Sequence, residues 1–159
     1  MAYTDILSLA QAKIYLRVDD SNTADDADIT AMLNAAFEYI EDYTGHIMES
    51  GNRTYVLVDA KARVYDTPIT ALVSPATAVA TAKSLYTAYQ NTDPTETVLT
   101  LTVGYASAAD IPKPLLIAVR EIIAAWYYDQ DANDTQDSPK GLLSQKTISI
   151  LNRYKRFII

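Results

Sequence analysis

The apolar pattern of this 159-residue chain changes its period twice, and this limits the folds open to it. At both ends apolar residues recur every three or four positions, which is typical of amphipathic helices. Between residues 51 and 105 the chain is rich in threonine, valine, tyrosine and leucine with a period of two, which is typical of strands. The sequence therefore predicts helical ends around a β middle, and its length fits one domain.

Local signals mark the helices of the N-terminal third. The side chains of Ser8 and Gln11 can form a capping box, which begins a helix that runs to about Val18. Aspartates at positions 25, 26 and 28 place negative charge at the positive end of a second helix, which Gly45 ends near Tyr43. We expect two helices here.

The final third returns to helix. From Pro112 to Tyr128 only three side chains are charged, so this helix is expected to be buried in a core or against another subunit. A last helix is expected from about Ser144 to Tyr154. The residues that we expect to pack in the core or between subunits are Leu115, Val119, Ile122 and Trp126.

Three runs in the middle predict strands: residues 53–58, 84–90 and 98–105. The turn sequence Asn91–Pro94 separates the last two, so we expect them to form a hairpin. The stretch Pro68–Ala82 fits a loop, an edge strand or a short helix. The expected fold is mainly α, with four helices and a small inserted antiparallel β region around residues 51–105.

The composition argues against several kinds of active site. The chain has no cysteine and one histidine, His46, which excludes Cys/His zinc sites, thiol catalysis and any catalytic triad not built on His46. Its four glycines are isolated, so there is no glycine-rich phosphate loop. The aspartates at 19–28 lack the spacing of a calcium loop, and helix capping accounts for them. We predict no enzymatic activity, no cofactor and no metal.

Charge is divided unevenly along the chain, whose formal net charge is −7. Residues 1–50 hold two basic and ten acidic side chains, net −8, whereas the last seven residues hold Arg153, Lys155 and Arg156. The acidic balance argues against specific binding of duplex DNA, which needs a basic face. The longest uncharged run, residues 67–82, is too polar and too broken by proline to span a membrane.

Four segments in order resemble the head-tail connector proteins of long-tailed double-stranded DNA phages. The chain matches this family's patterns over roughly residues 5–45 and 103–156, whereas residues 50–100 show no motif that aligns. The segment Leu7–Asp19 resembles an LxxAKxxLRVD start, and Glu38–Gly45 resembles a Tyr-Ile-Glu-x-Tyr-Thr-Gly signature. The other two matches are a GY…IPxxLKxA…WY block over Val103–Tyr105, Ile111–Leu115 and Ala118–Tyr127, and an LLxxYR close over Ile150–Lys155.

The resemblance implies a single connector domain over residues 1–159, with a β-rich insertion at 51–105 and a C-terminal helix and docking tail at 144–159. It implies a structural virion protein, assembled in the host cytoplasm, that forms a ring of typically twelve copies between the portal and the stopper or tail. Genomic DNA would pass through the ring non-specifically. The residues expected to dock onto the portal are Arg153, Tyr154, Lys155, Arg156, Phe157, Ile158 and Ile159.

Two other interpretations stay open. The chain could be a different neck or tail protein, such as a stopper or a tail terminator, although these tend to be mostly β. It could also be a small-ligand domain built around His46 and the aspartates. For the C-terminal residues the alternative to docking is a helix end whose cations complement the helix dipole and whose apolar residues fold back onto the core.

Overall fold

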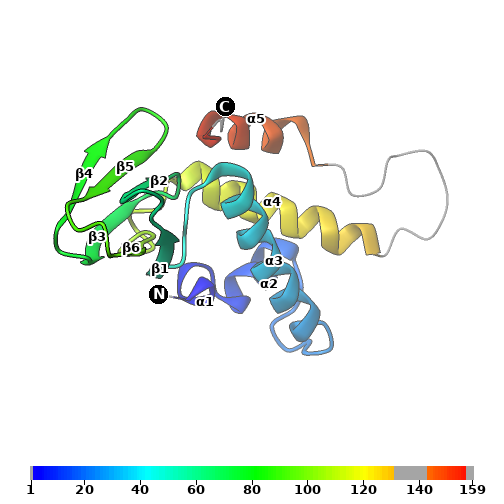
Figure 1. Ribbon diagram of the computed structural model, residues 1–159. Helices are drawn as coiled ribbons and strands as arrows, with labels where there is room; N and C mark the ends of the chain where they lie inside the picture. Colours follow the sequence, from blue (N-terminus) through cyan, green and yellow to red (C-terminus); the bar gives the residue numbers. More distant parts are fainter. Residues whose placement is uncertain (1, 131–142, 157–159) are drawn as a thin grey trace.

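The computed structural model describes residues 2–130 and 143–156, and it divides the chain into a helical half and a β half (Figure 1). The helices come from both ends of the chain, and the strands lie between α3 and α4 in the sequence. The chain therefore leaves the helical half after α3 and returns to it before α4. The described helices are α1 (Tyr3–Ile6), α2 (Leu9–Leu16), α3 (Asp26–Thr44), α4 (Lys113–Gln130) and α5 (Gln145–Tyr154).

Local chemistry sets the ends of the first long helices. The Ser8 hydroxyl accepts a hydrogen bond from the Gln11 amide, and the Gln11 side chain accepts one from the Ser8 amide, so the expected capping box is confirmed. At the end of α3, Gly45 adopts a left-handed conformation with φ 73°, which glycine reaches without steric cost. The expected end of this helix is therefore also confirmed.

A carboxylate on α4 holds the start of α5. Thr147 Oγ1 donates to Glu121 Oε2 at 2.6 Å, and Lys146 forms an ion pair with the same carboxylate. The Ser144 hydroxyl caps α5 by accepting from the Thr147 amide. These contacts place α5 along α4, with its C-terminal end close to the end of α3.

The β half contains two three-stranded antiparallel sheets, with strand orders β1–β6–β3 and β2–β5–β4. Alternate residues of β6 face the core: Leu99, Leu101 and Val103 are buried, whereas Val98 is exposed. The strands are β1 (Gly51–Val56), β2 (Lys61–Val64), β3 (Ile69–Ser74), β4 (Ala78–Ala82), β5 (Thr87–Asn91) and β6 (Val98–Val103).

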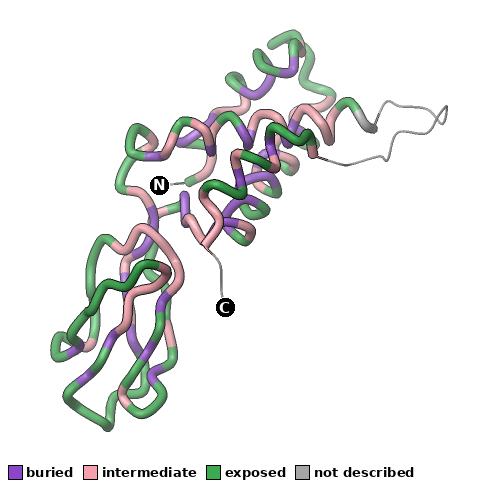
Figure 2. Tube along the Cα trace, turned by 90° about the horizontal axis from the view of Figure 1, so that it is seen from above, coloured by how far each residue is buried: buried purple, intermediate pink, exposed green. Residues whose placement is uncertain are grey.

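Each half has its own apolar core, as the buried stretches in Figure 2 show. The helical core is built around Phe37, Leu33 and Ile122, which are fully buried. The β core joins residues of both sheets, among them Val64, Tyr89 and Leu101. Because both sheets contribute to one core, the β half is more than a loop-like excursion from the helices.

The expected mainly α fold is therefore wrong. The β region holds six strands in two sheets with a core of its own, and α1 adds a short helix to the four expected ones. The expected hairpin is wrong as well: β5 pairs with β2 and β4, whereas β6 pairs with β1 and β3. The ambiguous stretch 68–82 supplies β3 and β4, whose mostly exposed residues lack a clear alternation.

Candidate functional site

The candidate site is the junction between the two halves, where the end of α5 meets β2 and the hairpin between β4 and β5. This is where the structure places most of the described residues expected to dock onto the portal. Arg153 is exposed on α5, whereas Tyr154, Lys155 and Arg156 are half-buried. Phe157, Ile158 and Ile159 lie outside the described residues.

Arg156 joins the helical half to the β half. Its Nη1 donates to the backbone oxygens of Tyr65 at 3.2 Å and Leu85 at 3.4 Å, and its backbone amide donates to Thr44 O at 3.3 Å. Hydrogen bonds from a charged donor are about twice as strong as neutral ones. The Arg156 guanidinium therefore already has partners within the chain, whereas the Arg153 side chain is exposed to solvent.

Two neighbours of Arg156 stack on side chains of α3 and of the segment after it. The Tyr154 ring meets the His46 ring edge-on, with centroids 5.7 Å apart, and the Lys155 ammonium lies 4.6 Å from the centre of the Tyr43 ring. Cation–π contacts of this kind contribute about 0.5–1 kcal/mol at exposed sites. The end of α5 is thus fixed by aromatic contacts as well as by hydrogen bonds.

His46 lies at the centre of the junction. Its Nδ1 is 2.7 Å from the Tyr105 hydroxyl, and the two rings stack with centroids 6.2 Å apart. Burial, and secondarily the charge of Arg156, lowers the pKa of the His46 ring below its usual value of 6.5. The His46 ring is neutral at physiological pH, and it contacts the aromatic side chains of Tyr105 and Tyr154.

A carboxylate at the end of α3 ties the first strand to the helices. Glu41 is 6% exposed, and its Oε1 accepts from the amides of Met48 at 2.6 Å and Glu49 at 3.2 Å. Burial raises the pKa of this carboxyl, and these two backbone hydrogen bonds oppose the shift. Arg53 of β1 then lies between Glu41 and Asp66, at 3.4 Å from each.

A pocket of about 170 Å³ opens between these groups, with Glu41, Arg53, Asp66 and Arg156 in its wall. Each of these charged side chains already has a protein partner. Such an arrangement stabilises a junction, and a small ligand would have to displace existing pairs to bind there.

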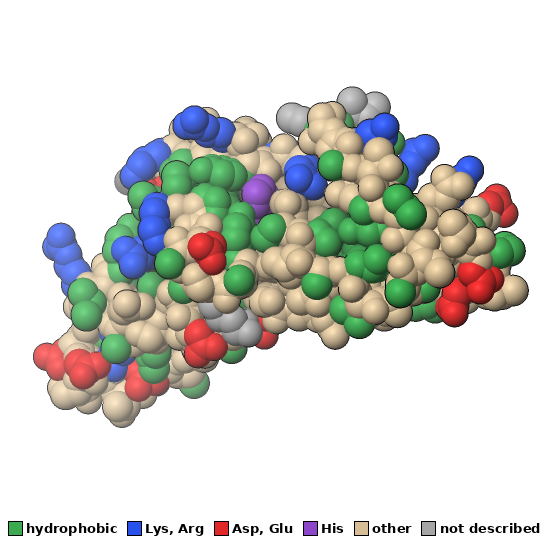
Figure 3. Space-filling model, turned by 90° about the vertical axis from the view of Figure 1, so that its left-hand side faces the viewer, with side chains coloured by type: hydrophobic (Ala, Val, Ile, Leu, Met, Phe, Trp, Pro, Cys, Tyr) green, Lys and Arg blue, Asp and Glu red, His purple; other side chains and the backbone are tan. Residues whose placement is uncertain are grey.

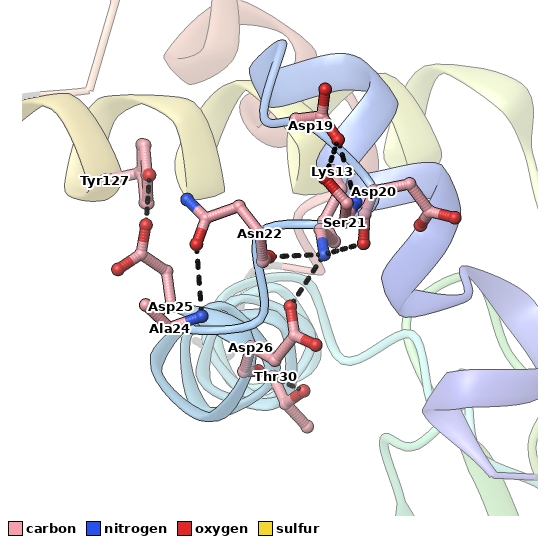
Figure 4. Close-up of polar contacts among 10 residues, drawn as sticks. All are labelled: Lys13, Asp19, Asp20, Ser21, Asn22, Ala24, Asp25, Asp26, Thr30 and Tyr127. Atoms are coloured by element: carbon pink, nitrogen blue, oxygen red, sulfur yellow. Dashed lines mark hydrogen bonds and ion pairs between the residues drawn. The ribbon is translucent and has the colours of Figure 1, made fainter.

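The turn between α2 and α3 holds an internal cation, Lys13, through two backbone oxygens and one aspartate (Figure 4). The Lys13 ammonium, on a side chain that is 3% exposed, donates to Asp20 O, Asn22 O and Asp26 Oδ1 at 2.7–3.0 Å. Tyr127 of α4 donates to Asp25 Oδ2 at 2.8 Å. The lysine thus supplies the positive charge that this turn needs, which the sequence did not indicate.

The four residues expected to pack in a core or between subunits all lie on α4. Leu115, Val119 and Ile122 are fully buried within the helical half. Trp126 is half-buried against the same core. Its ring and the Tyr39 ring meet edge-on, with centroids 6.4 Å apart. Whether Trp126 also contacts a second subunit stays a prediction.

Within residues 2–130 and 143–156 no group of three or more His, Asp or Glu side chains is placed to hold a metal ion. Over the same residues, no helix has both the length and the apolar character needed to cross a membrane.

Paired charges and stacked rings thus fasten the two halves together. The chain belongs to the phage gp6-like head-tail connector family, whose sequence profile matches residues 6–158. Members of this family are structural proteins of the virion neck, so the resemblance seen in the sequence is confirmed. A comparison with curated proteins finds no match.

Solved structures share the whole fold. A chain from the neck of an empty gene transfer agent (GTA) particle, computed with C6 symmetry, has a TM-score of 0.75 and 16% identity. It is covered over 94% of its length, and it covers 100% of this chain. A chain from the neck of a native GTA particle, computed with C12 symmetry, has a TM-score of 0.69 and 17% identity, with 100% and 94% of the two chains covered. At these identities the likeness shows the fold, including the β half that has no aligned motif.

Proposed function

We propose that this chain forms a closed ring, of twelve copies, between the portal and the stopper or tail of a phage particle. The ring extends the DNA channel and is the adaptor to which the tail attaches. The observation that carries this proposal is the family match over residues 6–158. The C6 and C12 symmetries of the GTA necks that share the fold also support a ring.

The acidic surface suits a channel protein that must not hold DNA. With a net charge of −7 the chain repels the phosphate backbone, so DNA can slide past without specific contacts. The rival interpretations have less support. The family match is to head-tail connectors and not to stoppers or tail terminators. The charged side chains of the junction pocket are already paired with one another or with backbone oxygens, which disfavours a small-ligand site there.

We further propose that the C-terminal residues dock this chain onto the portal, with Arg153 as the exposed cation and Phe157, Ile158 and Ile159 as the apolar anchors. Arg156 is left out of this set because it already bonds Tyr65 and Leu85. Each docked chain holds the next one near its site, so weak contacts repeated around a ring add up to strong binding.

The test of this function uses the full chain and purified portal rings. Wild-type chain should convert from monomers to large rings at high concentration or on the portal, as measured by mass photometry. A variant that lacks residues 157–159 and carries Arg153→Glu should fold and form rings but no longer bind the portal. Portal binding equal to wild type would place docking elsewhere, and failure of the wild type to form rings would contradict the adaptor itself.

A further inference from the structure

The outer face of the β2–β5–β4 sheet is basic. Lys61 and Arg63 alternate with the buried Ala62 and Val64 on β2, so both cations point away from the β core. Lys83 follows the end of β4. The strand register places Gln90 and Ala88 of β5 opposite Lys61 and Arg63. A shallow pocket of about 230 Å³ lies on this face.

These cations have no anionic partner among the described residues. The ion pairs in that part of the chain involve Lys13, Arg53 and Lys146 instead. The Arg63 guanidinium lies 5.5 Å from the centre of the Tyr86 ring, a contact that positions it without neutralising it. Figure 3 shows this end of the molecule, with Lys and Arg side chains gathered along its upper part and the acidic side chains in separate groups.

The exposed face of α3 has the opposite character. From Asp26 to Thr44 the helix contains no Lys or Arg. Its exposed positions recur along one side of the helix, where residues three and four apart are neighbours, and form an acidic stripe. They are Ala27, Asp28, Ala31, Ala35, Glu38, Tyr39 and Asp42. Glu38 and Asp42 are like charges at i and i+4, and their repulsion destabilises the helix when no cation lies nearby.

The two faces complement each other, yet no ion pair joins them within the described residues of one chain. We propose that the basic face of the β2–β5–β4 sheet binds the acidic stripe of α3 of a second copy of this chain. Because the two faces belong to different halves, the contact is head-to-tail, the type that closes into rings. The small side chains of Ala31 and Ala35 let the partner sheet approach the helix. The inference rests on the ring proposed above and names the surfaces that form it.

The test reverses charges that form no ion pair among the described residues. One variant carries Lys61→Glu and Lys83→Glu, and a second carries Glu38→Lys and Asp42→Lys, where cations near a helix C-terminus favour folding. Lys113→Glu with Arg17→Glu is the control, because both side chains are exposed on the helical half and the change in charge is the same. Circular dichroism verifies folding, and mass photometry gives the concentration at which rings form.

Each of the two variants alone should need at least about tenfold more protein than wild type to form rings, whereas the control should match wild type. An equimolar mixture of the two variants should form rings again. When the two variants alternate around the ring, every contact joins an acidic face of one variant to a basic face of the other. Higher salt should weaken assembly of the wild type.

Rings from either variant at the wild-type concentration would overturn this contact and leave the ring itself standing. Failure of the mixture to restore rings would also overturn this contact. So would a Lys61→Glu/Lys83→Glu variant that forms rings like wild type but binds less duplex DNA, because the basic face would then bind DNA. A wild-type chain that forms no rings would overturn the proposed function and this inference with it.

Discussion

At the scale of single residues, Gly104 shows how closely the end of β6 approaches the residues that lead into its partner strand β1. It follows β6 with φ 102°, and a Cβ there would lie 2.7 Å from Glu49 O and from the Ser50 Cα. No side chain fits this conformation and this contact without a shift of backbone. The close approach fixes the end of β6 against the strand that follows α3.

We therefore expect Gly104→Ala to lower the free energy of unfolding by about 2 kcal/mol or more. Gly51→Ala is the matched control, because nothing lies within 4 Å of its added Cβ, and its effect should stay within about 0.5 kcal/mol. Urea denaturation measures both. Equal stability of the two variants would show that the close approach at Gly104 is absent.

His46 gives the junction a pH dependence. Because the pKa of the folded-state ring lies below 6.5, the unfolded chain takes up a proton first as the pH falls. The contribution of His46 to stability is therefore complete above about pH 6.5 and decreases below it. The wild type should lose more stability than His46→Phe between pH 7.5 and 5.5, as measured by denaturation at each pH. Parallel pH profiles would contradict this role.

At the scale of elements, Arg156 fastens α5 to β2 and to the β4–β5 hairpin through backbone oxygens. Arg156→Ala should lower the free energy of unfolding by about 1.5–3 kcal/mol, since it removes two charge-assisted hydrogen bonds. Amide exchange should also rise in residues 78–91. Arg153→Ala, on the exposed side of α5, should change stability by less than about 0.5 kcal/mol. A milder effect for Arg156→Ala than for Arg153→Ala would contradict this assignment.

The helices could be predicted because their signals are local. Ser8, Gln11 and Gly45 act on neighbouring residues, so the helix ends follow from the sequence within a few positions. Strand pairing depends on contacts between distant residues. The turn between β5 and β6 suggests a hairpin, but β5 lies at the centre of one sheet and β6 at the centre of the other. The mostly exposed residues of β3 and β4 give no alternating pattern from which these strands could be predicted.

The candidate site could be predicted only in part, for a related reason. The sequence indicates a basic end at Arg153–Arg156, but the partners of Arg156 are carbonyl groups of Tyr65 and Leu85, which no side-chain pattern reveals. The internal bonds of Lys13 were missed in the same way, because two of its three partners are backbone oxygens. The family could be identified because its motifs lie in the helical ends.

At the scale of the whole molecule, two separately packed halves are joined at one polar junction. The helical half carries the acidic stripe of α3, and the β half carries the basic face of the second sheet. A subunit with complementary faces on its two halves suits a ring in which every copy makes the same contact twice. The junction then sets the angle between those faces, which links its stability to ring closure.

The most direct test is a cryo-EM reconstruction of the neck of the particle that contains this chain, computed first without imposed symmetry. We predict a closed ring of twelve copies between portal and tail, with DNA passing through the centre and the β half of each copy against α3 of the next. A neck without this chain, or with it outside a closed ring, would contradict the account.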